Sequence, residues 1–406
     1  MRCTLRLLLV FFTALLSSTA VAKSKWTVLV YVVADNNLDG YAPLDFEEIS
    51  RVGSDANINV VAQIDRAGDS EGWTNTRRFL IRPGDKIDAS PLENLGEQNM
   101  GDPETLKDFV NWGAQNFPAD RTALIIWNHG SGWRNAQVNN APGGGHKYVA
   151  SDDSDGDALY NSEVVDALRA TGENIDLIGF DACLMSTIET WYGLANLAAV
   201  GVGSQDLEPG TGWFYDRFLS NLKKDPAASP EQLARWIVSS YKEGYEELGE
   251  ITQVAESYTL AAIDLKEVKK LSTTLSEISP KLLADFNDVD AVRDGLTPFH
   301  IPDSDWPHLV DVKKLFDELH GMNPQREYKS ISKALDNVVF ASVRSEDRVD
   351  QGSAGISIYF PRTMEWYQAD PFGDAYRKSN EAYPVAFVQD VSWADFLQEY
   401  LKKKPH

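Results

Sequence analysis

Short runs of consecutive apolar residues recur through the first half of the chain. Residues 26–33 (WTVLVYVV) form the first run, and residues 57–64 repeat the pattern. Runs of this length that are apolar on both faces are typical of strands buried inside a parallel sheet. Residues 123–127, 175–180 and 198–203 show the same property. These five segments predict the strands of a mostly parallel sheet.

Segments with helical periodicity alternate with these strands. An Asp-Pro-Glu sequence opens one helix, expected to end near Phe117, because the acidic residue caps it and proline takes its first position. Other helices are expected over residues 43–52, 162–171 and 185–195. Alternating strands and helices with short links predict βαβ units, with helices on both faces of the sheet.

Two segments depart from this alternation. Residues 76–81 end at a Pro-Gly-Asp turn and are expected to form an antiparallel strand. After about Leu248 the pattern becomes helix-rich, although residues 355–360 (GISIYF) again have the pattern of a buried strand. We therefore expect a sheet-based catalytic unit over residues 23–250, with a C-terminal subdomain over residues 251–406 packed on it.

The first 22 residues have the pattern of an export signal. Two arginines precede an apolar run over residues 7–16, and an Ala-Val-Ala sequence ends at Ala22. This order of a basic region, a short apolar run and small residues is typical of a cleaved signal peptide, with an uncleaved anchor as the alternative. No later segment has the uninterrupted apolar length of a membrane span. The mature chain is expected to begin near Lys23 and to be exported, either secreted or periplasmic.

Composition narrows the classes of function. The 406 residues are 43% hydrophobic, which is enough for a packed core, and they carry a formal net charge of −23. A chain this acidic is not expected to bind nucleic acid or an anionic membrane surface. Two cysteines cannot form a disulfide scaffold. Cys3 lies in the predicted signal peptide, so Cys183 is expected to be the sole thiol of the mature protein.

Two chemically reactive side chains follow two of the predicted strands. His129 lies two residues after the strand over 123–127, and Cys183 lies shortly after the strand over 175–180. Ligands bind at the carboxyl ends of parallel strands, so neighbouring strands would bring both side chains to one cleft. A helix expected to begin near Met185 would lower the pKa of the thiol.

Each of these residues also has a structural interpretation. A lone cysteine at a strand end is often a small core residue, and a lone histidine is often a hydrogen-bonded one. Their pairing at the ends of two strands, in an exported protein with an unpaired thiol, favours a nucleophile with an acid–base partner.

Several motifs resemble the signatures of the clostripain family of cysteine peptidases, which belongs to the caspase, gingipain and legumain clan. These are residues 127–133 (WNHGSGW), 181–185 (DACLM), 34–38 (ADNNL), 208–210 (EPG) and 355–361 (GISIYFP). Each match is weak alone, but together they span most of the mature chain in the order of the family. The resemblance implies a caspase-like α/β/α sandwich around a mostly parallel sheet.

The resemblance also implies roles for particular residues. His129 and Cys183 match the catalytic dyad, and the backbone N–H groups of Gly130 and Cys183 match the oxyanion hole. Asp181 matches the acid that selects Arg, or Lys, at the P1 position of protein or peptide substrates. On an extended strand Asp181 would share a face with Cys183, although it could instead be a helix cap or a buried structural residue. The chemistry requires no cofactor.

The sequence departs from the family after the strand over residues 198–203. Ser204, Gln205 and Asp206 stand where the family has Ser-Glu-Glu. We expect this segment to line the substrate cleft, with a plain loop as the alternative.

An acidic loop raises the question of calcium. Asp152, Asp153, Asp155 and Asp157 offer the oxygen ligands that Ca²⁺ prefers, and some relatives depend on calcium. The loop lacks the bidentate Glu of an EF-hand, so a solvated acidic loop is the alternative. The remaining histidines have no zinc-ligand spacing.

Relatives are often activated by cleavage between the two dyad strands. Lys147 is the first candidate for such self-cleavage and Arg134 the second, because both lie in a long glycine-rich segment. Two other functions remain open: a transpeptidase or amidase that uses the same acyl-enzyme, and an inactive relative that binds peptides.

Overall fold

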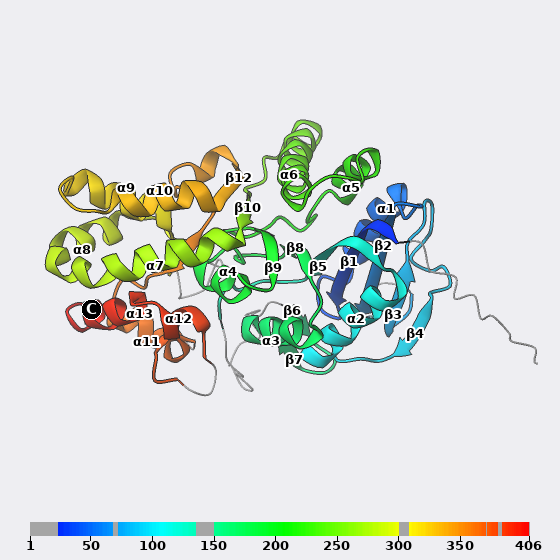
Figure 1. The fold of residues 1–406 in the computed structure, drawn as a ribbon, viewed down its shortest axis with the longest axis horizontal. Coiled ribbons are helices and arrows are strands. Elements are labelled where there is room, and N and C mark those ends of the chain that lie inside the picture. Colours follow the sequence, from blue (N-terminus) through cyan, green and yellow to red (C-terminus); the bar gives the residue numbers. More distant parts are fainter. Residues whose placement is uncertain are drawn as a thin grey trace, which may run out of the picture.

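The structure is a computed structural model (Figure 1). It describes residues 23–67, 72–134, 150–299, 308–370, 372–380 and 384–405. The predicted signal peptide, residues 1–22, lies outside the described residues.

One large sheet organises the described part of the chain. Its nine strands lie in the order β12-β10-β9-β8-β5-β1-β2-β3-β4. In chain order they are β1 (Ser24–Ala34), β2 (Ile58–Arg66), β3 (Thr76–Leu80), β4 (Glu93–Gly96), β5 (Ala119–Trp127), β8 (Ile175–Asp181), β9 (Ala198–Gly203), β10 (Thr259–Asp264) and β12 (Val339–Arg344). Two short hairpin-like pairs lie apart from it, β6 (Ala150–Asp152) with β7 (Asp157–Leu159) and β11 (Leu309–Asp311) with β13 (Ser357–Tyr359).

The centre of the sheet is parallel and its edges are antiparallel. Strands β9, β8, β5, β1 and β2 pair in parallel, and these are the five strands that the apolar runs predict. Strand β3 pairs antiparallel with β2, as its sequence predicts. Strand β10 pairs antiparallel with both β9 and β12.

Alternation along β1 explains why helices cover both faces. Leu29, Tyr31 and Val33 contribute to one buried cluster, while Val28 and Val30 contribute to another. Successive side chains of a strand point to opposite faces, so an uninterrupted apolar run requires a core on each side.

Helices supply the outer layers of both cores. They are α1 (Ala42–Val52), α2 (Pro103–Asn116), α3 (Asn161–Thr171), α4 (Ile188–Leu194), α5 (Tyr215–Lys224), α6 (Pro230–Thr252), α7 (Leu265–Leu282), α8 (Phe286–Gly295), α9 (Val312–Met322), α10 (Lys329–Val338), α11 (Met364–Ala369), α12 (Ala386–Asp390) and α13 (Trp393–Lys402). Helices α1, α5 and α6 pack on one face, and α2, α3 and α4 on the other (Figure 1). The α2 cap is as predicted, because Asp102 accepts a hydrogen bond from the Glu104 N–H.

The C-terminal part is joined to the sheet. Helices α7 to α13 gather at one end of the molecule (Figure 1), but β10 and β12 from the same part of the chain extend the main sheet. The predicted strand over residues 355–360 is present as β13, which pairs with β11 outside the main sheet. The division at residue 250 therefore stays a prediction about folding units.

Candidate active site

The two strands that carry the predicted dyad are neighbours. Strands β5 and β8 pair in parallel with Trp127 opposite Asp181, and the Asn128 N–H extends the pairing by donating to the Asp181 carbonyl at 3.3 Å. His129 and Cys183 each lie two residues beyond their strand. The predicted adjacency is thus confirmed, and both residues lie at the carboxyl edge of the sheet, where parallel sheets bind ligands.

A cavity of about 240 Å³ opens at this edge. Its wall combines the end of β5, the end of β8 and residues 207–212, with Leu38 from the loop after β1. His129, Cys183 and Asp181 all line it. The structure therefore brings the three principal site residues of the sequence together around one cavity.

His129 is held by the loop that follows β1. Its Nε2 lies 2.8 Å from the Asn37 side-chain oxygen. The preceding residue, Asn128, donates to the carbonyls of Val33 and Ser151 at 2.6 and 3.0 Å, which fixes the backbone beneath the imidazole. Asn37 is a positioning residue that sequence reasoning missed. It belongs to the ADNNL motif, whose resemblance to the family was the available signal.

Gly130 lies directly against the backbone of Cys183. A Cβ atom at position 130 would stand 2.0 Å from the Cys183 carbonyl oxygen and 2.8 Å from its nitrogen. No side chain fits in that space, so glycine is required here for close backbone approach. The two main chains that the resemblance assigns to the oxyanion hole are in contact.

The thiol of Cys183 is less acidic than the sequence predicts. The expected helix begins at Ile188 and not near Met185, with Thr187 as its cap, so its N-terminus lies five residues beyond the cysteine. Burial, together with the charges of Asp206 and Asp181, raises the pKa of the thiol to about 11, although a hydrogen bond from the Glu208 N–H to Sγ at 3.3 Å opposes this. The prediction of a lowered pKa was wrong.

Asp181 is a buried carboxyl group that still lines the cavity. It ends β8 and is 4% exposed, so it is no helix cap. Its Oδ2 accepts a hydrogen bond from the Tyr215 hydroxyl at 2.9 Å and one from the Trp213 N–H at 3.3 Å. Burial raises its pKa to about 6 in spite of these donors.

A second carboxyl group faces the same space. Glu208 lines the cavity, and burial followed by the charges of Asp181 and Cys183 raises its pKa well above the usual value. Asp45, which is buried, and Glu48, which is half-buried, are two further carboxyl groups near Asp181. Burial raises the pKa of each, and the charge of Asp181 adds to this effect. Sequence reasoning used Glu208 only as part of the EPG motif. Its placement opposite Asp181 depends on the path of the loop after β9.

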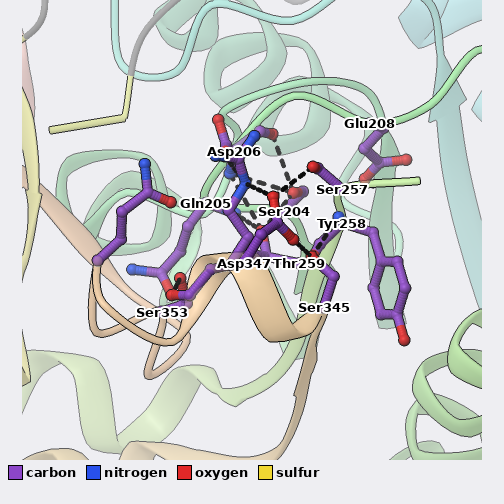
Figure 2. Close-up of polar contacts among 12 residues, drawn as sticks. Ser204, Gln205, Asp206, Glu208, Ser257, Tyr258, Thr259, Ser345, Asp347 and Ser353 are labelled. Carbon is purple, nitrogen blue, oxygen red and sulfur yellow. Dashed lines mark hydrogen bonds and ion pairs between the residues drawn. The ribbon is translucent and has the colours of Figure 1, made fainter. Parts of the chain in front are cut away.

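The segment 204–206 has a packing role in the structure. Ser204 bonds to the Thr259 hydroxyl at 2.7 Å (Figure 2). Gln205 donates to Asp311 at 3.0 Å, and Asp206 pairs with Arg348 at 2.8 Å. All three residues are buried, and the cavity is lined by their successors from Leu207 onward. The geometry therefore supports the structural alternative for this segment.

Comparison with known proteins decides the family. The model of the clostripain family, peptidase family C11, matches residues 30–400. The chain belongs to the clostripain family. It is 26% identical to clostripain from Hathewaya histolytica over 84% of this chain and 76% of that protein.

Solved structures share the fold. One is a secreted C11 cysteine protease from Bacteroides thetaiotaomicron in complex with an irreversible peptide inhibitor, with a TM-score of 0.66, 20% identity, and coverage of 93% of this chain and 99% of that one. Another is an inactive zymogen C11 protease from Parabacteroides distasonis, with a TM-score of 0.68, 20% identity and the same coverage. The protein is thus a cysteine peptidase with a caspase-like fold, and this chemistry needs no cofactor.

The resting state of this clostripain-family peptidase is expected to alkylate slowly. Only the thiolate reacts with iodoacetamide, so a pKa of about 11 predicts that the rate rises about tenfold per pH unit from pH 7 to 10. Intact-mass kinetics on the chain from Lys23 would measure this, because Cys183 is then its only cysteine. The same chain in denaturant serves as the control. An alkylation rate of the native protein that reaches a plateau at or below pH 8.5 would contradict the raised pKa of Cys183.

The acidic loop does not assemble as a calcium site. Asp152 is buried, with its oxygens accepting from the N–H groups of Met100 and Asp155, whereas Asp153, Asp155 and Asp157 are exposed. Among the described residues, Asp152 instead meets acidic side chains from other parts of the fold. The predicted set of four is therefore not the set that the structure brings together.

Of the two candidates for self-cleavage, the structure describes only Arg134. Lys147 lies outside the described residues. Arg134 is 5% exposed; it donates to the Ser131 carbonyl at 2.8 Å and lies 3.6 Å from the Asp370 carboxylate. A protease cannot bind a buried, paired arginine without local opening. This favours Lys147 of the two.

No helix among the described residues has the length and apolar content that a bilayer crossing demands.

Proposed function

We propose that the protein is an exported endopeptidase that cleaves after Arg, or Lys, through Cys183 and His129. One observation carries this proposal: a nucleophile, an acid–base group and a buried carboxyl group line a single cavity. Membership of the clostripain family supports the same reading of the site.

The chemistry follows from the order of groups around the cavity. The Cys183 thiol passes its proton to the His129 imidazole, the resulting thiolate attacks the scissile carbonyl carbon, and the carbonyl oxygen becomes an oxyanion. His129 donates a proton to the leaving amine as the carbon–nitrogen bond breaks, which leaves a thioester acyl-enzyme. Water then attacks the thioester, the acid product departs, and the thiol regains its proton. Asn37 keeps the imidazole oriented through both steps.

The oxyanion needs donors that are already in place. The backbone N–H groups of Gly130 and Cys183 are the proposed donors, and the close contact of these two main chains supports the assignment. Preorganised donors of this kind contribute about 2.7–4 kcal/mol of transition-state stabilisation each.

Selection of a basic P1 side chain is assigned to Asp181, with Glu208 beside it. Burial, followed by the charge of Asp181, raises the pKa of Glu208 well above its usual value, whereas a hydrogen bond from the protonated Glu208 favours the negative charge on Asp181. A guanidinium in the cavity would offset this negative charge and could bind a carboxylate in a bidentate manner. The same positive charge would reduce the field that raises the Cys183 pKa. Basic substrates would thereby help to form the thiolate that attacks them.

Export and activation complete the proposal. Residues 1–22 have the order of a signal peptide, and the family includes structures described as a secreted protease and as an inactive zymogen. We assign activation to cleavage after Lys147, within a segment that separates the dyad strands.

Self-cleavage predicts a difference in intact mass between two proteins. The wild type is expected to appear as two fragments divided after Lys147, whereas the Cys183→Ala variant remains a single chain. A Lys147→Ala variant should stay intact or be cut elsewhere, and Arg134→Ala should be cut after Lys147 as in the wild type. Single chains of unchanged mass for both the wild type and Cys183→Ala would rule self-cleavage out.

Fluorogenic peptides that differ only in P1 test the function. Once the protein has been cleaved, by itself or by limited proteolysis, Arg and Lys substrates are expected to be hydrolysed and an Asp substrate is not. Added hydroxylamine distinguishes the transpeptidase and amidase alternative, because an acyl-transferase would direct most product to the hydroxamate. Absence of turnover of every basic substrate after proteolysis would refute the proposal.

A further inference from the structure

Four carboxyl groups, none of which lines the cavity, meet near the carboxyl ends of β1 and β2. Asp35 follows β1, Asp65 lies near the end of β2, Glu97 follows β4, and Asp152 ends β6. One carboxylate oxygen from each lies within 4.8 Å of the others. Opposite oxygens in a Ca²⁺ shell, with bonds of 2.3–2.6 Å, lie about 5 Å apart. The cluster therefore has the dimensions of a cation site.

The state of Asp65 is a second and separate observation. This side chain is 0% exposed, and neither of its carboxylate oxygens has a hydrogen-bond partner among the described residues. The Thr76 hydroxyl lies nearby but does not reach hydrogen-bonding geometry. A buried carboxylate without donors is strongly unfavourable unless a cation or a proton compensates it.

Among the described residues, no basic side chain pairs with the negative charges of these four carboxylates. Across the described parts of the chain, no Lys or Arg forms an ion pair with Asp35, Asp65, Glu97 or Asp152. Arg66, next to Asp65, is bound to Asp39 at 2.7 Å. Ionised carboxylates need a partner here that the described residues do not supply.

We propose that Asp35, Asp65, Glu97 and Asp152 together bind one Ca²⁺ ion. The donors are all carboxylate oxygens, with no histidine or cysteine among them, which favours a hard cation over zinc. Magnesium retains several waters and rarely uses a site built from protein ligands alone, so calcium is the better match. This site differs from an acidic-loop site, because three of its four ligands come from outside residues 152–157.

The ion would stabilise the loop after β1, which holds His129. The carbonyl of Asp35 accepts a hydrogen bond from the Asp153 N–H at 2.8 Å, and Asn36 donates to the Ser151 carbonyl at 2.9 Å. Asn37, the next residue, holds the imidazole. A cation bound to Asp35 and Asp152 would therefore tie the loop after β1 to β6, beneath the catalytic histidine. This binding site is independent of which bonds the peptidase cleaves.

Calcium binding can be measured directly on a protein that cannot digest itself. The sample is the chain from Lys23 with Cys183→Ala, treated with EDTA and titrated with CaCl₂ or MgCl₂ by calorimetry and thermal unfolding. We expect one Ca²⁺ per chain and a rise in Tm of at least about 3 °C at saturation. Magnesium should bind at least tenfold more weakly.

Two matched variants locate the site. Asp65→Asn, in the same background, should weaken Ca²⁺ binding at least tenfold while its Tm in EDTA equals or exceeds that of the parent, since it removes a repelling charge. Asp155→Asn changes an exposed acid that is near the cluster but is not a proposed ligand, and it should weaken Ca²⁺ binding by less than about threefold. The proposal would be overturned if Asp65→Asn had unchanged Ca²⁺ affinity. It would also be overturned if the parent showed neither Ca²⁺ binding by calorimetry nor a change in Tm. Loss of binding only in Asp155→Asn would overturn it in favour of the acidic loop.

Discussion

Replacing Cys183 with alanine is expected to lower kcat/KM for an Arg substrate by at least about 10⁴-fold, to the limit of detection. Among the described residues that line the cavity, Cys183 is the only one with a thiol or hydroxyl nucleophile, and water cannot form the acyl-enzyme in its place. His129→Ala should cause a loss of similar size, because the leaving amine then departs without a proton. The double variant should be no worse than either single variant, since both residues serve the same step.

Stability measurements separate this loss from misfolding. Cys183→Ala is expected to unfold within a few degrees of the wild type, because the thiol is only partly buried and alanine leaves a small space. Asn37→Ala offers a graded comparison, since it removes one hydrogen-bond partner of the His129 imidazole and keeps the imidazole itself. Turnover by Cys183→Ala within tenfold of the wild type would show that another group is the nucleophile.

Replacing Asp181 with asparagine is expected to lower kcat/KM for an Arg substrate by about 10²- to 10³-fold. The substitution keeps the shape and the hydrogen bonds from Tyr215 and Trp213 but removes the charge that pairs with the guanidinium. Most of the loss should appear in KM. Glu208 remains in the cavity as a second carboxyl group that can accept hydrogen bonds from a guanidinium, so the loss should not reach that of Cys183→Ala.

The pH dependence of P1 selectivity measures the ionisation of Asp181 separately from that of Cys183 and His129. Because its pKa is raised to about 6, Asp181 loses its charge as the pH falls through 6, and basic P1 groups then bind less tightly. The ratio of kcat/KM for an Arg substrate to that for a neutral one should fall about tenfold for each pH unit below 6. Any titration of the dyad cancels in this ratio. In Asp181→Asn the ratio should be low and independent of pH.

A control on the same strand makes this result specific. Asp176→Asn lies at the opposite end of β8, where Asp176 accepts from the Thr122 N–H, and it should leave selectivity unchanged. An Asp181→Asn variant that retains wild-type preference for Arg would assign P1 selection to another group, with Glu208 the next to be replaced.

The central sheet and the dyad could be predicted because their signals are local. A strand buried on both faces must be apolar at every position, so residues 26–33 and 175–180 are recognisable alone. His129 and Cys183 follow such strands directly, and the sequence predicts one helix between those strands. Adjacency then follows from the βαβ rule.

Other features depend on contacts between distant segments, which no local pattern records. The cluster of Asp65 with Asp152 exists because β6 crosses the end of the sheet, and a search for ligand spacing found only the contiguous loop. The pKa of Cys183 depends on burial beneath the segment that follows β9. The expected helix dipole was misplaced because the chain turns at Cys183 and Leu184, the latter with a φ of 62°, and α4 begins only at Ile188.

Labelling with a peptidyl chloromethyl ketone that carries Arg at P1 tests the central claim most directly. Mass spectrometry of the digested protein should place one adduct per chain on Cys183 in the wild type. Asp181→Asn should label at least tenfold more slowly, while Asp176→Asn labels at the wild-type rate. An adduct on a residue other than Cys183, or equal labelling by a reagent with Asp at P1, would contradict a Cys183 nucleophile served by an acidic P1 pocket.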